Sequence, residues 1–191
     1  MTARRALATV VIGAAIASIF PATAYAAPVV PARAVLTAAE LPSGSKDYMV
    51  FPIAALPAPT GPAPNTSSQC ETASHALQTS LAGVPAVEAE AWHGDTHFYA
   101  SVVGRAATAK FTAQDSACGE TANATRLPVP ADLVRLDPVL LRVNTHRITG
   151  MADVRGATVG VIASSPDDRP LSLDTFWQVF RAQVAKVERQ P

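Results

Sequence analysis

The stretch LDTFWQVFRAQVAKV, residues 173–187, decides the fold of this chain. Its apolar residues recur at the three- and four-residue spacing of one helix face, and charged residues occupy the other side. The apolar face comprises Leu173, Phe176, Trp177, Phe180, Val184 and Val187, and the polar side comprises Arg181, Lys186, Glu188 and Arg189. Ser172 precedes the stretch as a suitable N-cap. The stretch predicts an amphipathic helix, and such a helix must cover another apolar surface.

Predicted strands supply that surface. Residues 157–163, ATVGVIA, form the most apolar and β-like run in the chain, which predicts a central strand. The alternation in residues 87–92, followed by residues 98–103, predicts a β-hairpin. We expect further strands at 47–53, 110–112, 124–129 and 141–146, and turns at 133–138 and 150–156. The predicted fold class is α+β, with a mostly antiparallel sheet and helices packed on one face.

Two capping boxes and several prolines organise the first half of the chain. Thr37 and Glu40 have capping-box spacing, but Pro42 limits that helix to about one turn. Ser68 and Glu71 open a longer helix, which Gly83 ends. Residues 56–66 contain four prolines and are expected to form an extended surface loop. Residues 27–34 lack periodicity and are expected to be a disordered leader, so that a single domain spans residues 35–191.

The first 26 residues have the composition of a secretory signal peptide. Arg4 and Arg5 precede an apolar run over residues 6–20, and Ala24-Tyr25-Ala26 places small residues where a signal peptidase reads them. The run is shorter than the ~20 residues that span a bilayer. We therefore expect cleavage after Ala26, no membrane span in the mature chain, and a secreted or cell-envelope location. The arginine pair also leaves twin-arginine export open, although the residues after it match that signal poorly.

The two cysteines, Cys70 and Cys118, both remain after this cleavage. An even pair of cysteines in an oxidising compartment favours a disulfide. In the chain-entropy model, closing a loop of this length stabilises the fold by about 4 kcal/mol. No cysteine follows the cleavage site directly, so a lipid anchor has no acceptor there.

Charge and length limit the classes of partner. Removing residues 1–26 removes two of the 15 basic residues and none of the 15 acidic residues, which leaves a net charge of about −2. Nucleic acid and anionic membranes attract proteins with a surplus of Lys and Arg, so this balance argues against both. The remaining length suits one domain that buries roughly 70% of its unfolded surface.

The histidines allow two readings. His93 and His97 flank a predicted turn. A two-residue turn at Gly94-Asp95 places their side chains on opposite faces of the hairpin, whereas a three-residue turn places them on one face near Asp95, as a weak metal site. We interpret them as solvated loop residues, and we interpret His75 and His146 as isolated surface residues.

No other group carries a catalytic pattern. Glu88 and Glu90 share one strand face, which we interpret as solvated, because a glycosidase pair normally comes from different elements across a cleft. The chain lacks a G-x-S-x-G elbow, a Ser-x-x-Lys motif and a phosphate-cradling glycine loop. We therefore predict no catalytic residue, no metal and no cofactor. Phe176 and Trp177 could line a ligand pocket under the last helix, although core packing is the alternative.

Several of these features together resemble a known group of exported proteins. They are the Ser68-Gln69-Cys70 helix start with Ala76-Leu77, the second cysteine Cys118, the segment 155–159 that opens a late strand, and the closing helix. Over roughly residues 36–188 the layout resembles exported actinobacterial proteins related to the extracellular sensor domain of the mycobacterial kinase PknH. That domain has two disulfides, whereas this chain can form one. The resemblance implies an α+β domain with a cleft for an envelope ligand.

These observations favour one hypothesis and leave two alternatives. The first is a secreted, non-enzymatic binding or sensor-like module of the cell envelope, whose partner is an unknown envelope ligand or protein. The alternatives are a secreted hydrolase acting on envelope material and a protein-interaction module that uses residues 56–66.

Overall fold

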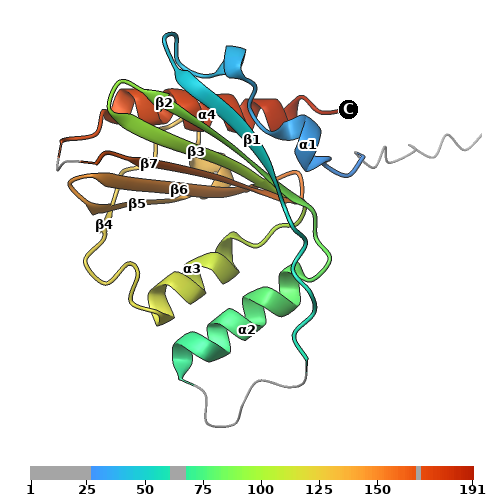
Figure 1. Ribbon diagram of the computed structural model, residues 1–191. Helices are drawn as coiled ribbons and strands as arrows, with labels where there is room; N and C mark the ends of the chain where they lie inside the picture. Colours follow the sequence, from blue (N-terminus) through green and yellow to red (C-terminus); the bar gives the residue numbers. More distant parts are fainter. Residues whose placement is uncertain (1–26, 61–67, 167–168) are drawn as a thin grey trace, which may run out of the picture.

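The computed structural model describes residues 27–60, 68–166 and 169–191. The predicted signal peptide, residues 1–26, and most of the predicted proline-rich loop lie outside these ranges. Seven strands form one antiparallel sheet in the order β1-β2-β3-β7-β6-β5-β4 (Figure 1). Together with the helices and the disulfide Cys70–Cys118, this sheet confirms the predicted α+β fold.

The bounds of the elements follow the chain order. The strands are β1 (Lys46–Ile53), β2 (Ala86–His93), β3 (Thr96–Val103), β4 (Thr125–Arg126), β5 (Val139–Asn144), β6 (Arg147–Val154) and β7 (Ala157–Ser164). The helices are α1 (Pro31–Ala34), α2 (Gln69–Leu81), α3 (Thr108–Ala117) and α4 (Leu173–Glu188), and the 3-10 turns are η1 (Ala38–Glu40) and η2 (Val134–Leu136).

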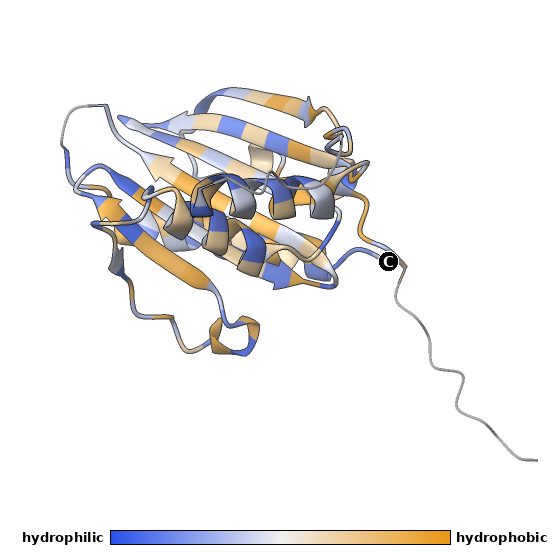
Figure 2. Cartoon of the chain, turned by 90° about the horizontal axis from the view of Figure 1, so that it is seen from below, coloured by the Kyte–Doolittle hydropathy of each residue, from blue (hydrophilic) through white to orange (hydrophobic). Residues whose placement is uncertain are grey.

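Helix α4 lies across one face of the sheet, as the sequence predicts. Ser172 caps it by accepting a hydrogen bond from the Thr175 amide at 3.3 Å. Phe176 and Phe180 are fully buried against alternate residues of the central strands, including Val159 and Val161. Figure 2 shows this alternation as bands of hydrophilic and hydrophobic residues along the strands. The main core therefore fills the layer between α4 and the sheet.

Gly150 on β6 lies directly beneath aromatic rings of α4. A Cβ atom at this position would lie 2.8 Å from Cζ of Phe176 and 2.9 Å from Cδ2 of Leu140. It would also lie 3.1 Å from Cε2 of Phe180. A glycine is therefore required for the two aromatic rings to rest on the strand backbone.

Helices α2 and α3 lie on the opposite side of the sheet from α4 (Figure 1). They pack on each other through a small cluster of Leu77, Leu81 and Ala107, with Val103 and Phe111 against it. The disulfide joins Cys70, in the first turn of α2, to Cys118, which caps the end of α3. This second helical layer was not predicted, because α3 was not recognised as a helix.

The predicted disordered leader is wrong for its last residues. Residues 31–34 form α1, and Pro31 and Ala34 are buried. A glutamine of α4 and a glutamine just after that helix hold this segment: Gln183 donates to the Ala34 carbonyl at 2.6 Å, and Gln190 accepts from the Val30 amide at 2.9 Å. The folded domain therefore begins before residue 35, because polar side chains in and just after the last helix satisfy its backbone groups.

Two other predictions are corrected. Residues 110–112, expected as a strand, lie inside α3, and residues 150–154, expected as part of a turn, lie inside β6. The turn that follows β6 consists of Arg155 and Gly156, which both have positive φ angles, 51° and 78°. Such a pair suits a two-residue hairpin turn, so Gly156 marks the turn and Gly150 does not.

The described residues contain no helix that is long and apolar enough to cross a membrane.

We expect Gly150→Ala to destabilise the protein by about 1–3 kcal/mol, since the added methyl group must displace aromatic rings in a filled core. Gly160→Ala is the matched control on the neighbouring strand. Its Cβ would meet only Oγ of Ser101, at 2.7 Å, and that hydroxyl can rotate away. Urea unfolding should place Gly160→Ala within about 1 kcal/mol of wild type. Equal losses in the two variants would contradict the assigned contact.

Candidate functional site

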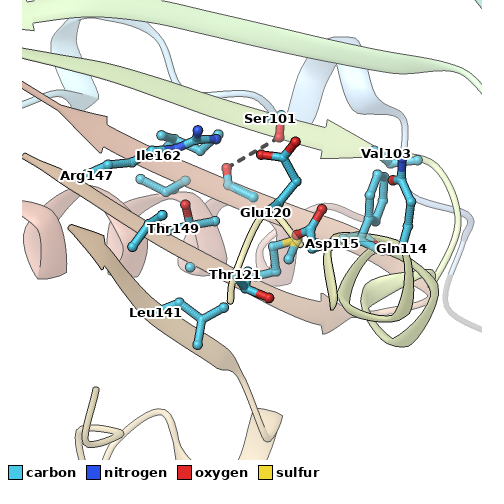
Figure 3. A pocket seen from close by; sticks show the side chains of 17 residues that line it. Ser101, Val103, Gln114, Asp115, Glu120, Thr121, Leu141, Arg147, Thr149 and Ile162 are labelled. Atoms are coloured by element: carbon cyan, nitrogen blue, oxygen red, sulfur yellow. Dashed lines mark hydrogen bonds between the residues drawn. The ribbon is translucent and has the colours of Figure 1, made fainter. Parts of the chain in front are cut away.

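A hollow with a volume of about 380 Å³ lies between α3 and the sheet face opposite α4. We call this face the open face, and we call this cavity the central hollow (Figure 3). Strands β3, β5, β6 and β7 form its floor, and α3 with the residues after it forms one wall. Its lining includes Ser101, Phe111, Asp115, Glu120, Leu141, Arg147, Thr149, Met151, Gly160 and Ile162.

The pairing register brings these floor residues together. Ile162 of β7 lies opposite Thr149 of β6, which in turn lies opposite Leu141 of β5. The next row places Ser101, Gly160 and Met151 side by side. Because alternate residues of a strand point to the same face, both rows face away from α4. These two rows are therefore mostly apolar, with the hydroxyl groups of Ser101 and Thr149 among them.

Gly160 keeps the floor of the central hollow deep. It stands in the middle of a strand whose other open-face residues, Thr158 and Ile162, carry branched side chains. The absence of a side chain leaves only backbone there, in contact with the Ser101 hydroxyl. A strand glycine at such a place leaves room for another molecule to approach the backbone.

A carboxylate from the sheet holds the start of α3 over the open face. Oδ1 of Asp153 accepts hydrogen bonds from the amides of Ala107 and Thr108, both at 3.2 Å, and from the Thr108 hydroxyl at 2.7 Å. The Thr158 hydroxyl accepts from the Ala107 amide at 2.7 Å. The first N–H groups of a helix need such acceptors, and α3 has no N-cap side chain of its own.

The wall of the central hollow carries two carboxylates, and its far end carries one guanidinium. Asp115 lies in the last turns of α3, and Glu120 lies just after it. Arg147 begins β6 and comes from the opposite end of the hollow (Figure 3). Burial, together with the charge of Glu120, raises the pKa of the Asp115 carboxyl, and Arg147 opposes this rise.

A second hollow of about 400 Å³ adjoins the central one on the open face, with Arg147 and Ile162 lining both. Its other lining residues are Glu88, Tyr99 and Ser164. Burial, and to a lesser extent the charge of Glu90, raises the pKa of Glu88. The open face therefore carries a surplus of carboxylates along two connected depressions.

The structure separates the predicted ligand-pocket pair from these hollows. Phe176 is fully buried in the core under α4, and Trp177 packs edge-on against it, with ring centroids 5.1 Å apart. Neither residue lines the central hollow, which lies on the other face of the sheet. The core-packing alternative is the one that the structure shows.

The predicted histidine and glutamate pairs lie on β2 and β3. His93 pairs with Thr96 and His97 with Trp92, which is the register of the two-residue turn. The two imidazoles therefore point to opposite faces, and the alternative metal site on one face does not form. Among the described residues, no three or more His, Cys, Asp or Glu side chains are grouped to hold a metal ion.

His97 takes part in an aromatic row on the open face. Its ring stacks on Trp92 with centroids 4.4 Å apart, and its Nε2 lies 3.3 Å from a carboxylate oxygen of Glu90. Glu88 and Glu90 share this face, as predicted, but both are half-buried rather than freely solvated.

Sequence reasoning missed the residues that line the central hollow. Arg147, Thr149 and Met151 alternate in a way that indicates a strand, but the turn expected at Gly150 concealed this pattern. Asp115 and Glu120 carry no sequence signal, since they reach the hollow only because α3 stands over the sheet.

Comparison of the chain with protein-family models, with curated proteins and with solved structures finds no match. The central hollow is therefore interpreted from its own geometry.

We expect Asp153→Ala to release the start of α3 and to destabilise the protein by about 0.5–2 kcal/mol. Ser172→Ala, which removes the cap of α4, is the matched control. Hydrogen exchange followed by NMR should show faster exchange at residues 108–112 in Asp153→Ala and not in Ser172→Ala. Unchanged exchange of these α3 amides would show that Asp153 does not anchor the helix.

We expect Asp115→Asn to stabilise the protein at pH 7. A raised pKa in the folded state means that ionising Asp115 opposes folding, so this cost is absent below its ordinary pKa of 3.8 and develops as the pH rises. The stability gain of Asp115→Asn should therefore disappear near pH 3. Asp132→Asn is the control with the opposite sign, because Arg181 lowers the pKa of Asp132. Its loss of stability at pH 7 should fade as the pH falls. Thermal unfolding of the three proteins at both pH values measures these differences.

Proposed function

We propose that this protein is an exported, non-enzymatic binding module of the cell envelope that receives a small amphipathic ligand in the central hollow. The observation that carries the proposal is the hollow itself: an apolar floor with a few hydroxyl and charged groups, on a sheet face that α3 covers only in part. Pockets that bind small molecules have this composition and size.

The proposed location rests on two features. A disulfide persists in oxidising compartments outside the cytoplasm, and Cys70–Cys118 ties the wall of the hollow to α2. The composition of residues 1–26 predicts a signal peptide cleaved after Ala26. The resemblance to extracellular sensor domains of the PknH type, which implies an α+β domain with a cleft, supports the same role.

The rigidity of the floor supports binding in preference to mere structural packing. Four hydrogen-bonded strands position the floor residues, and α3 is held at its start by Asp153 and at its end by the disulfide. A pocket with a fixed floor and a wall fixed at both ends loses little conformational entropy when a ligand enters. The open face thus provides a largely preformed site.

We expect 1-hexanol, used as a probe of the apolar floor, to bind the central hollow. The oxidised chain should be expressed with its own leader and recovered from outside the cell, with mass spectrometry confirming a start at Ala27. Titration followed by NMR should then shift the amide signals of Ser101, Thr149 and Ile162. Thr149→Trp, which fills the hollow, should weaken binding at least about tenfold, as expected when most of the buried contact area is lost.

Thr79→Trp is the control for that experiment, since Thr79 is exposed on α2 and lies outside the hollow. Retention of the probe by Thr149→Trp, or signal changes confined to residues under α4, would contradict the proposed site. A chain that stays inside the cell with its leader intact would contradict the proposed location.

A further inference from the structure

We propose that the central hollow selects cationic ligands, namely amines that carry an apolar body. The inference rests on the function proposed above and adds the chemical class of the ligand. It follows from the carboxylates that line the hollows, from the absence of salt bridges to them within the described residues, and from the position of Arg147.

The carboxylates around the two hollows outnumber the cations. Asp115 and Glu120 line the central hollow, Glu88 lines the adjoining one, and among the described lining residues Arg147 is the only basic one. The lining therefore carries a net negative charge when all four groups are ionised. A wall of one charge sign above an apolar floor raises the local concentration of oppositely charged molecules.

No basic side chain forms a salt bridge with these three carboxylates among the residues that the structure describes. Within the same residues, salt bridges are formed by Glu40, Glu90, Asp95, Asp132 and Glu188. Asp115, Glu120 and Glu88 form none, and unlike Glu71 and Asp153, which cap helices, they face the two hollows. A bound cation would supply the missing partner.

Figure 3 shows how the charged side chains of the central hollow lie. Asp115 and Glu120 stand together on the α3 side above the floor, and Arg147 stands at the other end. An ammonium group near the two carboxylates leaves the apolar body over Leu141, Met151 and Ile162. An anion placed against Arg147 in the central hollow would instead share that space with the carboxylates of Asp115 and Glu120.

The pKa of the Asp115 carboxyl agrees with this arrangement. Burial and the neighbouring carboxylate raise the pKa of Asp115, so its ionised form is short of favourable interactions in the free protein. A cation restores those interactions, whereas a neutral ligand only removes more water and an anion adds repulsion.

The test compares three probes that share one apolar body: hexylammonium, 1-hexanol and hexanoate. NMR titration of the oxidised chain at pH 7 gives a Kd for each. We expect hexylammonium to have the lowest Kd and hexanoate the highest. Each carboxylate that contacts the ammonium group should change the Kd by a factor of about two to five. Raising the salt concentration should reduce the advantage of hexylammonium, because salt screens partly exposed charges.

Isosteric variants locate the effect. Asp115→Asn and Glu120→Gln should each weaken the binding of hexylammonium about two- to fivefold and weaken the binding of 1-hexanol by less. Arg147→Gln should strengthen the binding of hexylammonium, because it removes a positive charge from the lining. Asp95→Asn is the matched control, since this exposed carboxylate at the β2–β3 turn pairs with Arg169, outside the hollow.

The outcomes separate the two proposals. Equal binding of the three probes, or tightest binding of hexanoate, overturns the selection of cations and leaves the binding function standing. Loss of hexylammonium preference in Asp95→Asn also overturns the assignment to Asp115 and Glu120. Absence of any signal change in the central hollow with all three probes overturns the proposed function itself.

Discussion

The contact of Phe176 and Phe180 with the backbone of Gly150 is the constraint on which the rest of the molecule depends. It seats α4, the most strongly amphipathic helix, flat on one face of the sheet and closes the main core there. A seven-stranded antiparallel sheet has a second face, over which the described residues place two helices, α2 and α3. Because α4 closes the core on its own face, the hollows lie on the open face.

The position of α3 turns that open face into a site. Helix α3 buries few apolar residues, and Asp153 and the disulfide hold its two ends. Polar and covalent tethers of this kind fix a helix over a surface without filling the space beneath it. A helix with a broad apolar stripe would instead collapse onto the floor, as α4 does on the other face. The central hollow remains because α3 packs mainly on α2, and Asp153 fixes its start, so the helix does not lie flat on the sheet.

The parts of the fold that follow local rules were predictable from the sequence. The last helix, the β2–β3 hairpin, the strand of residues 157–163 and both capping boxes rest on periodicity and short-range hydrogen bonds, and the structure has all of them. The wrong secondary-structure predictions share one cause, namely contacts with residues far away in the sequence. Residues 110–112 are helical because Asp153, far along the chain, caps α3. A glycine occurs inside β6 because the aromatic rings of α4 occupy the place of a side chain at residue 150. The candidate site depends on both tertiary contacts, so no local pattern could reveal it.

The charges of the open face give a reason to treat the hollow as functional rather than incidental. Half-buried carboxylates without partners oppose folding, and neutral amides of the same shape would remove that cost. Asp115 and Glu88 nevertheless lie in the two depressions of the open face, whereas other described carboxylates, such as Asp132 and Asp153, form an ion pair or cap a helix. Proteins tolerate such local costs mainly where a ligand uses the strained group. Under the function proposed above, the surface gives up some stability in the free protein and recovers it when a cation binds.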